Sequence, residues 1–166
     1  IDVVIPIPDT SRTSALQMAN HLGVKYREGF IKNRYIGRTF IMPGQQQRKK
    51  SVRQKLNAIE LEFKGKNVLL VDDSIVRGTT CKTRINNLKA AGAAEVHVLV
   101  SCPPHKNPCV YGIDFPDRSK LMAANYSLDN IKQYLNVDSL GYLSQEGMVK
   151  ATDLPAENFC MACYDG

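Results

Sequence analysis

Short apolar runs alternate along this chain with stretches in which apolar residues recur at helical spacing. The runs predict strands over residues 3–7, 67–71 and 96–100, and an extended piece over residues 24–28. The helical patterns predict long helices over residues 11–22 and 79–91, and shorter ones over residues 52–61, 119–124, 127–135 and 144–151. Elements in this order predict an α/β fold, with a central mainly parallel sheet flanked by helices.

The composition narrows the class of protein. Hydrophobic residues make up 43% and charged residues 23% of the 166 residues, which is typical of one soluble globular domain. No apolar run reaches the length of about 18 residues that a membrane-spanning helix needs. Five scattered cysteines make a poor disulfide framework and favour a reducing, cytoplasmic setting. The chain begins within an apolar run and without Met, which indicates a cut or processed end and not a signal peptide.

The basic residues gather in one segment. Residues 24–55 carry ten Lys and Arg against one acid, Glu28, whereas the net charge of the whole chain is only +6. An anionic partner is therefore expected, and both a nucleic acid and a small polyphosphate fit the charge. RNA is disfavoured because the irregular part of this segment, residues 33–50, offers only Tyr35 and Phe40 to stack on bases. Residues 33–50 show no period and predict a long mobile loop of the kind that usually has a function.

The most informative stretch covers residues 68–80 and reads VLLVDDSIVRGTT. Its apolar strand ends in the adjacent carboxylates of Asp72 and Asp73, and parallel α/β sheets bind ligands at that end of their strands. The small and hydroxylated residues that follow lead into a helix, so backbone N–H groups and the helix N-terminus can hold a phosphate. Two carboxylates beside a phosphate suit ribose hydroxyls or Mg²⁺. A turn that merely caps a helix at Thr79 is the simpler alternative. The chain contains neither a G-x-x-x-x-G-K-[ST] nor a G-x-G-x-x-G string.

This stretch resembles the phosphoribosyl pyrophosphate (PRPP) motif of type I phosphoribosyltransferases. Residues 5–11 (IPIPDTS), 32–43 (KNRYIGRTFIMP) and 109–116 (CVYGIDFP) are similar to those of the amidophosphoribosyltransferase family, and the resemblance covers essentially the whole chain. It implies a type I phosphoribosyltransferase core over residues 1–118, with a mobile catalytic loop, and a C-terminal helical extension over residues 119–166. It also implies the phosphoribosyltransferase half of an enzyme that transfers ammonia derived from glutamine to PRPP. The products would be 5-phosphoribosylamine and pyrophosphate, in the first committed step of de novo purine synthesis.

The resemblance carries site residues onto this sequence. The PRPP-binding residues that it implies are Asp9, Thr10, Ser11, Asp72, Asp73, Ser74, Ile75, Val76, Arg77, Gly78, Thr79 and Thr80. Among these, Thr10, Asp72 and Asp73 would also bind Mg²⁺. Lys32, Arg34 and Arg38 would be catalytic, because cations beside the departing pyrophosphate stabilise the charge that it gathers.

The cysteines permit a second metal site. Cys160 and Cys163 form a C-x-x-C pair that by itself leaves zinc, iron–sulfur and redox roles open. The resemblance implies a [4Fe–4S] cluster on Cys109, Cys160 and Cys163, with a fourth cysteine upstream of this chain. Cys81 and Cys102 are expected to be buried structural residues.

The resemblance also implies partners. They are an N-terminal glutaminase domain, which this chain lacks, inhibitory purine nucleotides, and further copies of the chain in a homo-oligomer. Two alternatives stay open: a nucleobase salvage phosphoribosyltransferase, and a PRPP-sensing regulator that binds RNA. His21 and His97 belong to no motif position and are expected to be structural.

Overall fold

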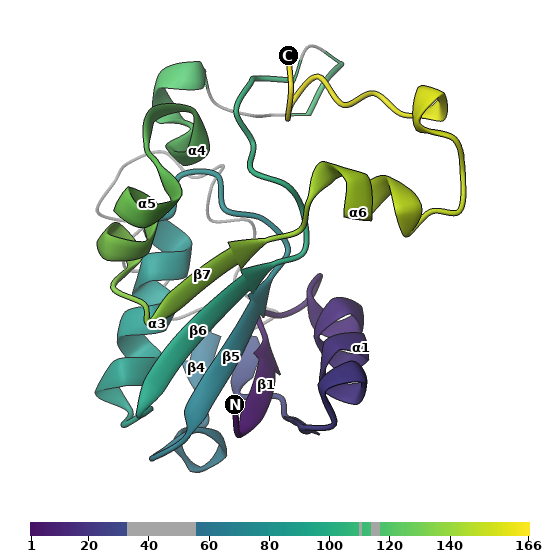
Figure 1. Ribbon diagram of the computed structural model, residues 1–166. Helices are drawn as coiled ribbons and strands as arrows, with labels where there is room; N and C mark the ends of the chain where they lie inside the picture. The colour runs from purple at the N-terminus through teal and green to yellow at the C-terminus, as the bar shows by residue number, and fades with distance from the viewer. Residues whose placement is uncertain (33–55, 110, 114–116) are drawn as a thin grey trace.

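Five parallel strands form the central sheet of the computed structural model, which describes residues 1–32, 56–109, 111–113 and 117–166 (Figure 1). The strands are β1 (Val3–Pro6), β2 (Lys25–Tyr26), β5 (Asn67–Asp72), β6 (Glu95–Val100) and β7 (Ser139–Tyr142). Their order is β2-β1-β5-β6-β7, and each neighbouring pair is parallel. The predicted parallel sheet is confirmed, and the carboxyl ends of its strands lie along one edge.

Helices cover the two faces of this sheet. The longer ones are α1 (Arg12–Leu22), α3 (Thr79–Ala90) and α5 (Leu128–Leu135). Ala15 and Ala19 of α1 form a small core with alternate residues of β1 and β5. On the opposite face α3 and α5 contribute Ile85 and Leu135 to the larger core, and Figure 1 shows these two helices on the side of the sheet away from α1. The long helices predicted over residues 11–22 and 79–91 are confirmed.

A small antiparallel sheet lies beside the main one. It pairs β3 (Phe30–Lys32) with β4 (Leu56–Ala58), and a 3₁₀ turn, η1 (Glu60–Glu62), follows. Phe30 and Phe63 are fully buried and join this sheet to the larger core. The helix predicted over residues 52–61 is therefore wrong in its described part, because residues 56–58 pair with β3. Residues 33–55, including the predicted mobile loop, lie outside the described residues.

The C-terminal part adds both helices and a strand. Its elements are η2 (Arg118–Lys120), α4 (Met122–Asn125), α5, β7, α6 (Gln145–Lys150) and η3 (Ala156–Asn158). Strand β7, which the sequence did not predict, pairs with β6 and forms one border of the main sheet. A purely helical extension over residues 119–166 is thus incorrect, while a domain division after residue 118 stays a prediction.

Loss of one helix cap gives a modest test of this C-terminal part. The Ser127 hydroxyl accepts a hydrogen bond from the Asn130 N–H at 3.3 Å and caps α5. We expect Ser127→Ala to lower the free energy of unfolding by about 1 kcal/mol, because a backbone N–H loses its partner. Urea denaturation measures the change. Ser127→Asp, which keeps a capping oxygen, is expected to retain wild-type stability, and equal losses in both variants would contradict the capping role.

Candidate active site

Two loops meet where the neighbouring strands β1 and β5 end. The Thr10 hydroxyl, from the loop after β1, donates a hydrogen bond of 2.5 Å to Asp73 Oδ2, from the loop after β5. The two loops are also joined beneath this contact by the Ile7 N–H, which donates to the Val71 carbonyl at 2.8 Å. The peptide bond between Pro8 and Asp9 is cis. The sheet thus brings together the two polar motifs that the sequence assigned to one ligand.

The adjacent carboxylates occupy different environments. Asp73 is half-buried and faces Thr10, whereas Asp72 is only 4% exposed. Asp72 Oδ1 accepts the Asp73 N–H at 3.1 Å and lies 3.9 Å from Nη1 of Arg84 on α3. Burial raises the pKa of Asp72 to about 7, although the Arg84 guanidinium opposes that shift. Asp73 therefore presents its charge to a ligand, and Asp72 lies behind it.

The loop after Asp73 has an anchored interior and an open rim. Ile75 is 2% exposed and belongs to the larger core, and Gly78 is buried with φ of +72° directly before α3. Arg77, Thr79 and Thr80 are exposed at the rim. No side chain caps the N-terminus of α3, so its first N–H groups and its positive dipole end are open to an anion.

The turn before α1 contributes a second helix N-terminus at the same edge. Ser11 is buried, and its hydroxyl has no hydrogen-bond partner among the described residues. Arg12 lies 3.4 Å from Asp9 and 3.1 Å from Glu28, whose other oxygen accepts the Tyr26 hydroxyl at 2.7 Å. Burial and Glu28 together raise the pKa of Tyr26 to about 12. Glu28, the single acid of the basic segment, thus orients a cation at the rim.

Thr10→Val tests the contact between the two loops. We expect the apparent affinity for PRPP, the ligand that the resemblance implies, to fall about tenfold or more, because the carboxylate of Asp73 loses a charge-assisted hydrogen bond. The KM for PRPP, measured by pyrophosphate release, reports the change. Thr13→Val, on the exposed surface of the first turn of α1, is the matched control and is expected to behave as wild type. Equal KM values in the two variants would show that the contact is unimportant.

The segment that carries Cys160 and Cys163 packs near the carboxyl ends of the strands, against the loop that follows β6. The Cys163 carbonyl accepts the N–H groups of Lys106 and Asn107 at 2.9 and 3.1 Å, and the ring of Tyr164 stacks on His105 at 5.0 Å. The pKa of Cys163 is raised, chiefly by burial, and Cys109 and Cys160 contribute to the rise. Within the described ranges, no three His, Cys, Asp or Glu side chains are close enough together to hold a metal ion.

The other predicted residues divide into two groups. Cys81 is buried and Cys102 half-buried, and burial raises the pKa of Cys102 to about 12, which fits structural thiols. Lys32 ends β3, while Arg34 and Arg38 lie outside the described residues. Sequence reasoning missed Arg84 and Glu28 as neighbours of the site, because neither belongs to a recognisable motif.

Comparison with known families shows which kind of domain these loops belong to. Residues 1–121 match the family model described as a phosphoribosyl transferase domain. The chain belongs to this family. This phosphoribosyl transferase domain is 57% identical over its full length to the amidophosphoribosyltransferase of Pseudomonas aeruginosa, and it covers 34% of that protein. It is 52% identical over 95% of its length to the amidophosphoribosyltransferase of Escherichia coli and covers 31% of it. The domain therefore spans about a third of the length of these curated relatives.

Solved structures share the fold of this phosphoribosyl transferase domain. Glutamine PRPP amidotransferase from B. subtilis, in complex with ADP and GMP, matches with a TM-score of 0.84 and 45% identity over 98% of the domain and 37% of that chain. A structure described as the allosteric regulatory enzyme of purine biosynthesis matches with a TM-score of 0.85 and 46% identity over 98% of the domain and 36% of that chain. The predicted type I phosphoribosyltransferase fold and the resemblance to amidophosphoribosyltransferases are confirmed. Among the described residues no helix is both long and apolar enough to cross a membrane.

Proposed function

We propose that this domain is the phosphoribosyltransferase half of an amidophosphoribosyltransferase. It transfers the phosphoribosyl group of PRPP to ammonia derived from glutamine, releasing pyrophosphate and 5-phosphoribosylamine in the first committed step of purine synthesis. The observation that carries the proposal is the 2.5 Å bond between Thr10 and Asp73, which joins two open helix N-termini at one edge of the sheet. The names of the relatives support ammonia as the acceptor.

Each end of PRPP has its own part of this edge. The loop from Ser74 to Thr80 binds the 5′-phosphate through backbone N–H groups and the dipole of α3. The turn from Asp9 to Ser11 contacts the pyrophosphate at the N-terminus of α1, where the buried Ser11 hydroxyl is available as a donor. Asp73 accepts the ribose hydroxyls that lie between these two anionic ends, and Asp72 supports it from behind.

The donors present at this edge fit Mg²⁺. Carboxylate and hydroxyl oxygens are the ligands that this cation prefers, and Thr10, Asp72 and Asp73 would hold it together with oxygens of PRPP. When bound, Mg²⁺ neutralises charge on the leaving pyrophosphate. Lys32, Arg34 and Arg38 are proposed to stabilise the same charge as catalytic residues. Because ammonia attacks an oxocarbenium-like carbon, the chain has to position the reactants and does not need a nucleophile of its own.

The thiols Cys109, Cys160 and Cys163 fit the donor chemistry of a [4Fe–4S] cluster but supply only three of its four ligands. We propose a structural cluster completed by a cysteine from outside this chain, and no catalytic step passes through it.

Further proposed partners are a glutaminase domain, inhibitory purine nucleotides and a second copy of the chain, and the proposed location is the cytoplasm. The B. subtilis structure that holds ADP and GMP supports nucleotide binding.

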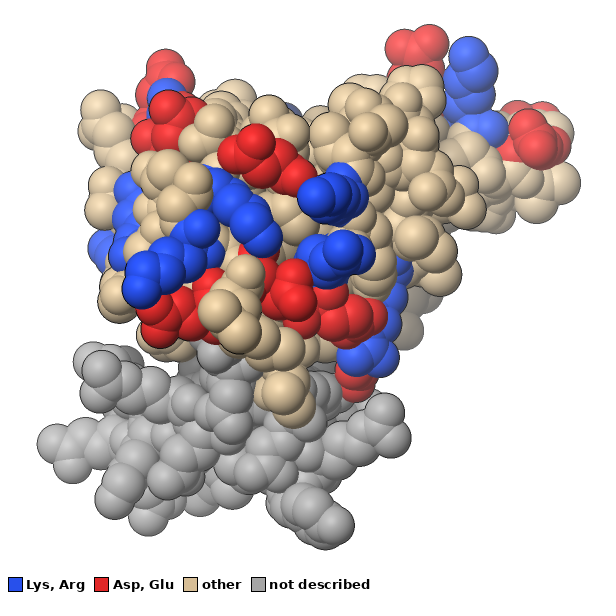
Figure 2. Space-filling view, turned by 90° about the horizontal axis from the view of Figure 1, so that it is seen from below, with Lys and Arg blue, Asp and Glu red and all other residues tan. Residues whose placement is uncertain are grey.

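The described surface gives the RNA-binding alternative little support. The face at the amino ends of the strands carries interleaved Lys, Arg, Asp and Glu (Figure 2). Lys64 lies 2.8 Å from Glu60, and Arg27 lies 3.4 Å from Glu62, so these cations are paired with acids. RNA binding instead favours clustered unpaired cations with aromatic side chains between them.

The molecule that accepts the phosphoribosyl group distinguishes an amidotransferase from a salvage enzyme. Pyrophosphate release from PRPP is measured in the complete protein that carries this chain, with Mg²⁺ and either ammonia, purine bases or pyrimidine bases. We expect release with ammonia only, and none in EDTA. Release with a base alone would assign the protein to the salvage enzymes, and PRPP binding without turnover would favour the regulator.

A further inference from the structure

Gly78, the last residue of the phosphate loop, fits into a notch made by the C-terminal part of the chain. A Cβ atom at this position would lie 2.7 Å from Sδ and 2.9 Å from Cε of Met122, and 3.3 Å from Cε1 of Tyr134. The φ of +72° also disfavours any residue with a side chain. The side chains of α4 and α5 therefore pack directly on the loop backbone that is proposed to hold the 5′-phosphate.

A main-chain hydrogen bond ties the same two segments together. The Met122 N–H donates to the Val76 carbonyl at 2.8 Å, and the Met122 side chain is only 7% exposed. The loop is thus fixed at Val76 by the backbone of Met122 and at Gly78 by its thioether. Met122 lies just beyond the family-model match, which ends at residue 121.

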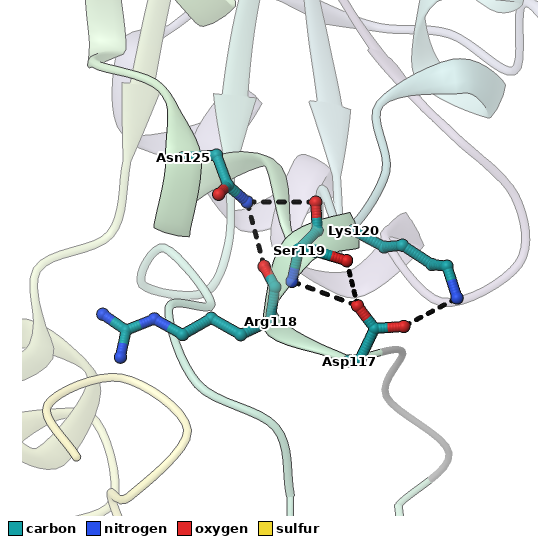
Figure 3. A network of polar contacts seen from close by, with 5 residues as sticks. All are labelled: Asp117, Arg118, Ser119, Lys120 and Asn125. Atoms are coloured by element: carbon teal, nitrogen blue, oxygen red, sulfur yellow. Dashed lines mark hydrogen bonds and ion pairs between the residues drawn. The ribbon is translucent and has the colours of Figure 1, made fainter.

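The segment that presents Met122 is itself tightly held (Figure 3). Asn125 Nδ2 donates to the carbonyls of Arg118, Ser119 and Leu121 at 2.9, 3.2 and 2.7 Å. Asp117 accepts the Ser119 N–H at 3.1 Å and the Ser119 hydroxyl, and also Lys120 Nζ at 2.6 Å. These bonds, led by that from Lys120, lower the pKa of Asp117 to about 2. We call residues 117–125 the buttress segment.

A second contact holds the other wall of the notch. Lys82 on α3 places Nζ 3.8 Å from the centroid of the Tyr134 ring, which is the geometry of a cation–π interaction. The backbone N–H of Lys82 donates to the Gly78 carbonyl at 2.9 Å, so α3, the loop and α5 meet at one point. The Tyr134 wall of the notch is therefore held by α3, which lies far from α5 in the sequence.

We propose that Met122 is a positioning residue for phosphate binding, and that the buttress segment, through Met122, holds the loop in its binding conformation. The proposal rests on the proposed function, because it takes the loop as the 5′-phosphate site. A loop that is already ordered loses little entropy when it binds, so a loosened notch weakens binding of the ground state and of the transition state alike. The signature is a higher KM with an unchanged kcat.

Three variants separate this role from general stability. Met122→Ala empties the notch, and Met122→Leu refills it with a side chain of similar volume. Asn125→Ala removes three hydrogen bonds from an exposed side chain and leaves no core cavity. Met18→Ala on α1 and Asn86→Ala on the exposed face of α3 are matched controls. Binding of ribose 5-phosphate and PRPP is measured by calorimetry on the complete protein, alongside KM and kcat for PRPP.

We expect Met122→Ala and Asn125→Ala to weaken ribose 5-phosphate binding and to raise the KM for PRPP about tenfold or more, with kcat changed less than about threefold. Met122→Leu and both controls are expected to retain wild-type affinity. Unchanged affinity in folded Asn125→Ala would overturn the proposal, and so would an equal loss in Met18→Ala. Because ribose 5-phosphate lacks the leaving group, its binding decides the role of Met122 even if the protein proves to transfer nothing to ammonia.

Discussion

Asp73→Asn is expected to lower kcat/KM for PRPP by about 10²- to 10³-fold. Asp73 is the half-buried carboxylate at the edge of the sheet, and it accepts the Thr10 hydroxyl at 2.5 Å. An amide at this position removes a full negative charge from the place where ribose hydroxyls and Mg²⁺ are proposed to bind. Steady-state pyrophosphate release, with ammonia as the acceptor, measures the loss.

The matched control is Asp129→Asn in the first turn of α5, an exposed carboxylate that belongs to neither of the two site loops. It is expected to keep wild-type kcat/KM. If Asp73→Asn retained full activity while folded, the assignment of the PRPP site to the carboxyl end of β5 would be wrong.

Asp72→Asn is expected to abolish most activity and yet to stabilise the metal-free protein above pH 7. Burial raises the pKa of Asp72 from 3.8 to about 7, so between these values the folded chain binds a proton that the unfolded chain has released. The stability of the wild type therefore falls as the pH rises through this window, by up to about 4 kcal/mol. Asn has no proton to lose and avoids this cost.

Thermal unfolding in EDTA at pH 5 and pH 8 tests the second half of this prediction. The melting temperature of Asp72→Asn is expected to exceed that of the wild type clearly at pH 8, with a smaller difference at pH 5. A difference that does not change with pH would show that the buried carboxyl does not titrate in this window.

Local signals in the sequence were sufficient for the central strands of the main sheet and for the loop that leads from β5 into α3. The apolar runs that became β1 and β5 are buried almost throughout, and alternate residues of β6 are buried, so their composition alone distinguishes them from loops. The adjacent residues Asp72 and Asp73 at the end of β5 indicate a candidate ligand site, because they place two carboxylates where a buried strand ends. The motif did not reveal that one of these carboxylates is buried against Arg84, since that depends on how α3 packs.

Features that depend on pairing between distant segments were not predictable. Val52, Leu56 and Ile59 have helical spacing, but the described residues 56–58 form β4 because Phe30–Lys32 lies beside them. The four residues of β7 include Gly141 and show no clear alternation, so only the exposed border of β6 makes them a strand. Likewise, nothing in the sequence around Met122 indicates that its side chain packs on Gly78.

Equilibrium binding of PRPP is the most direct test of the account, because the central claim places this ligand across the Thr10–Asp73 contact. Calorimetry on the complete protein is carried out with Mg²⁺ and again in EDTA, for the wild type, Thr10→Val and Asp73→Asn. The account predicts Mg²⁺-dependent binding that weakens about tenfold or more in each variant. Wild-type affinity in both folded variants would place PRPP elsewhere and contradict the claim.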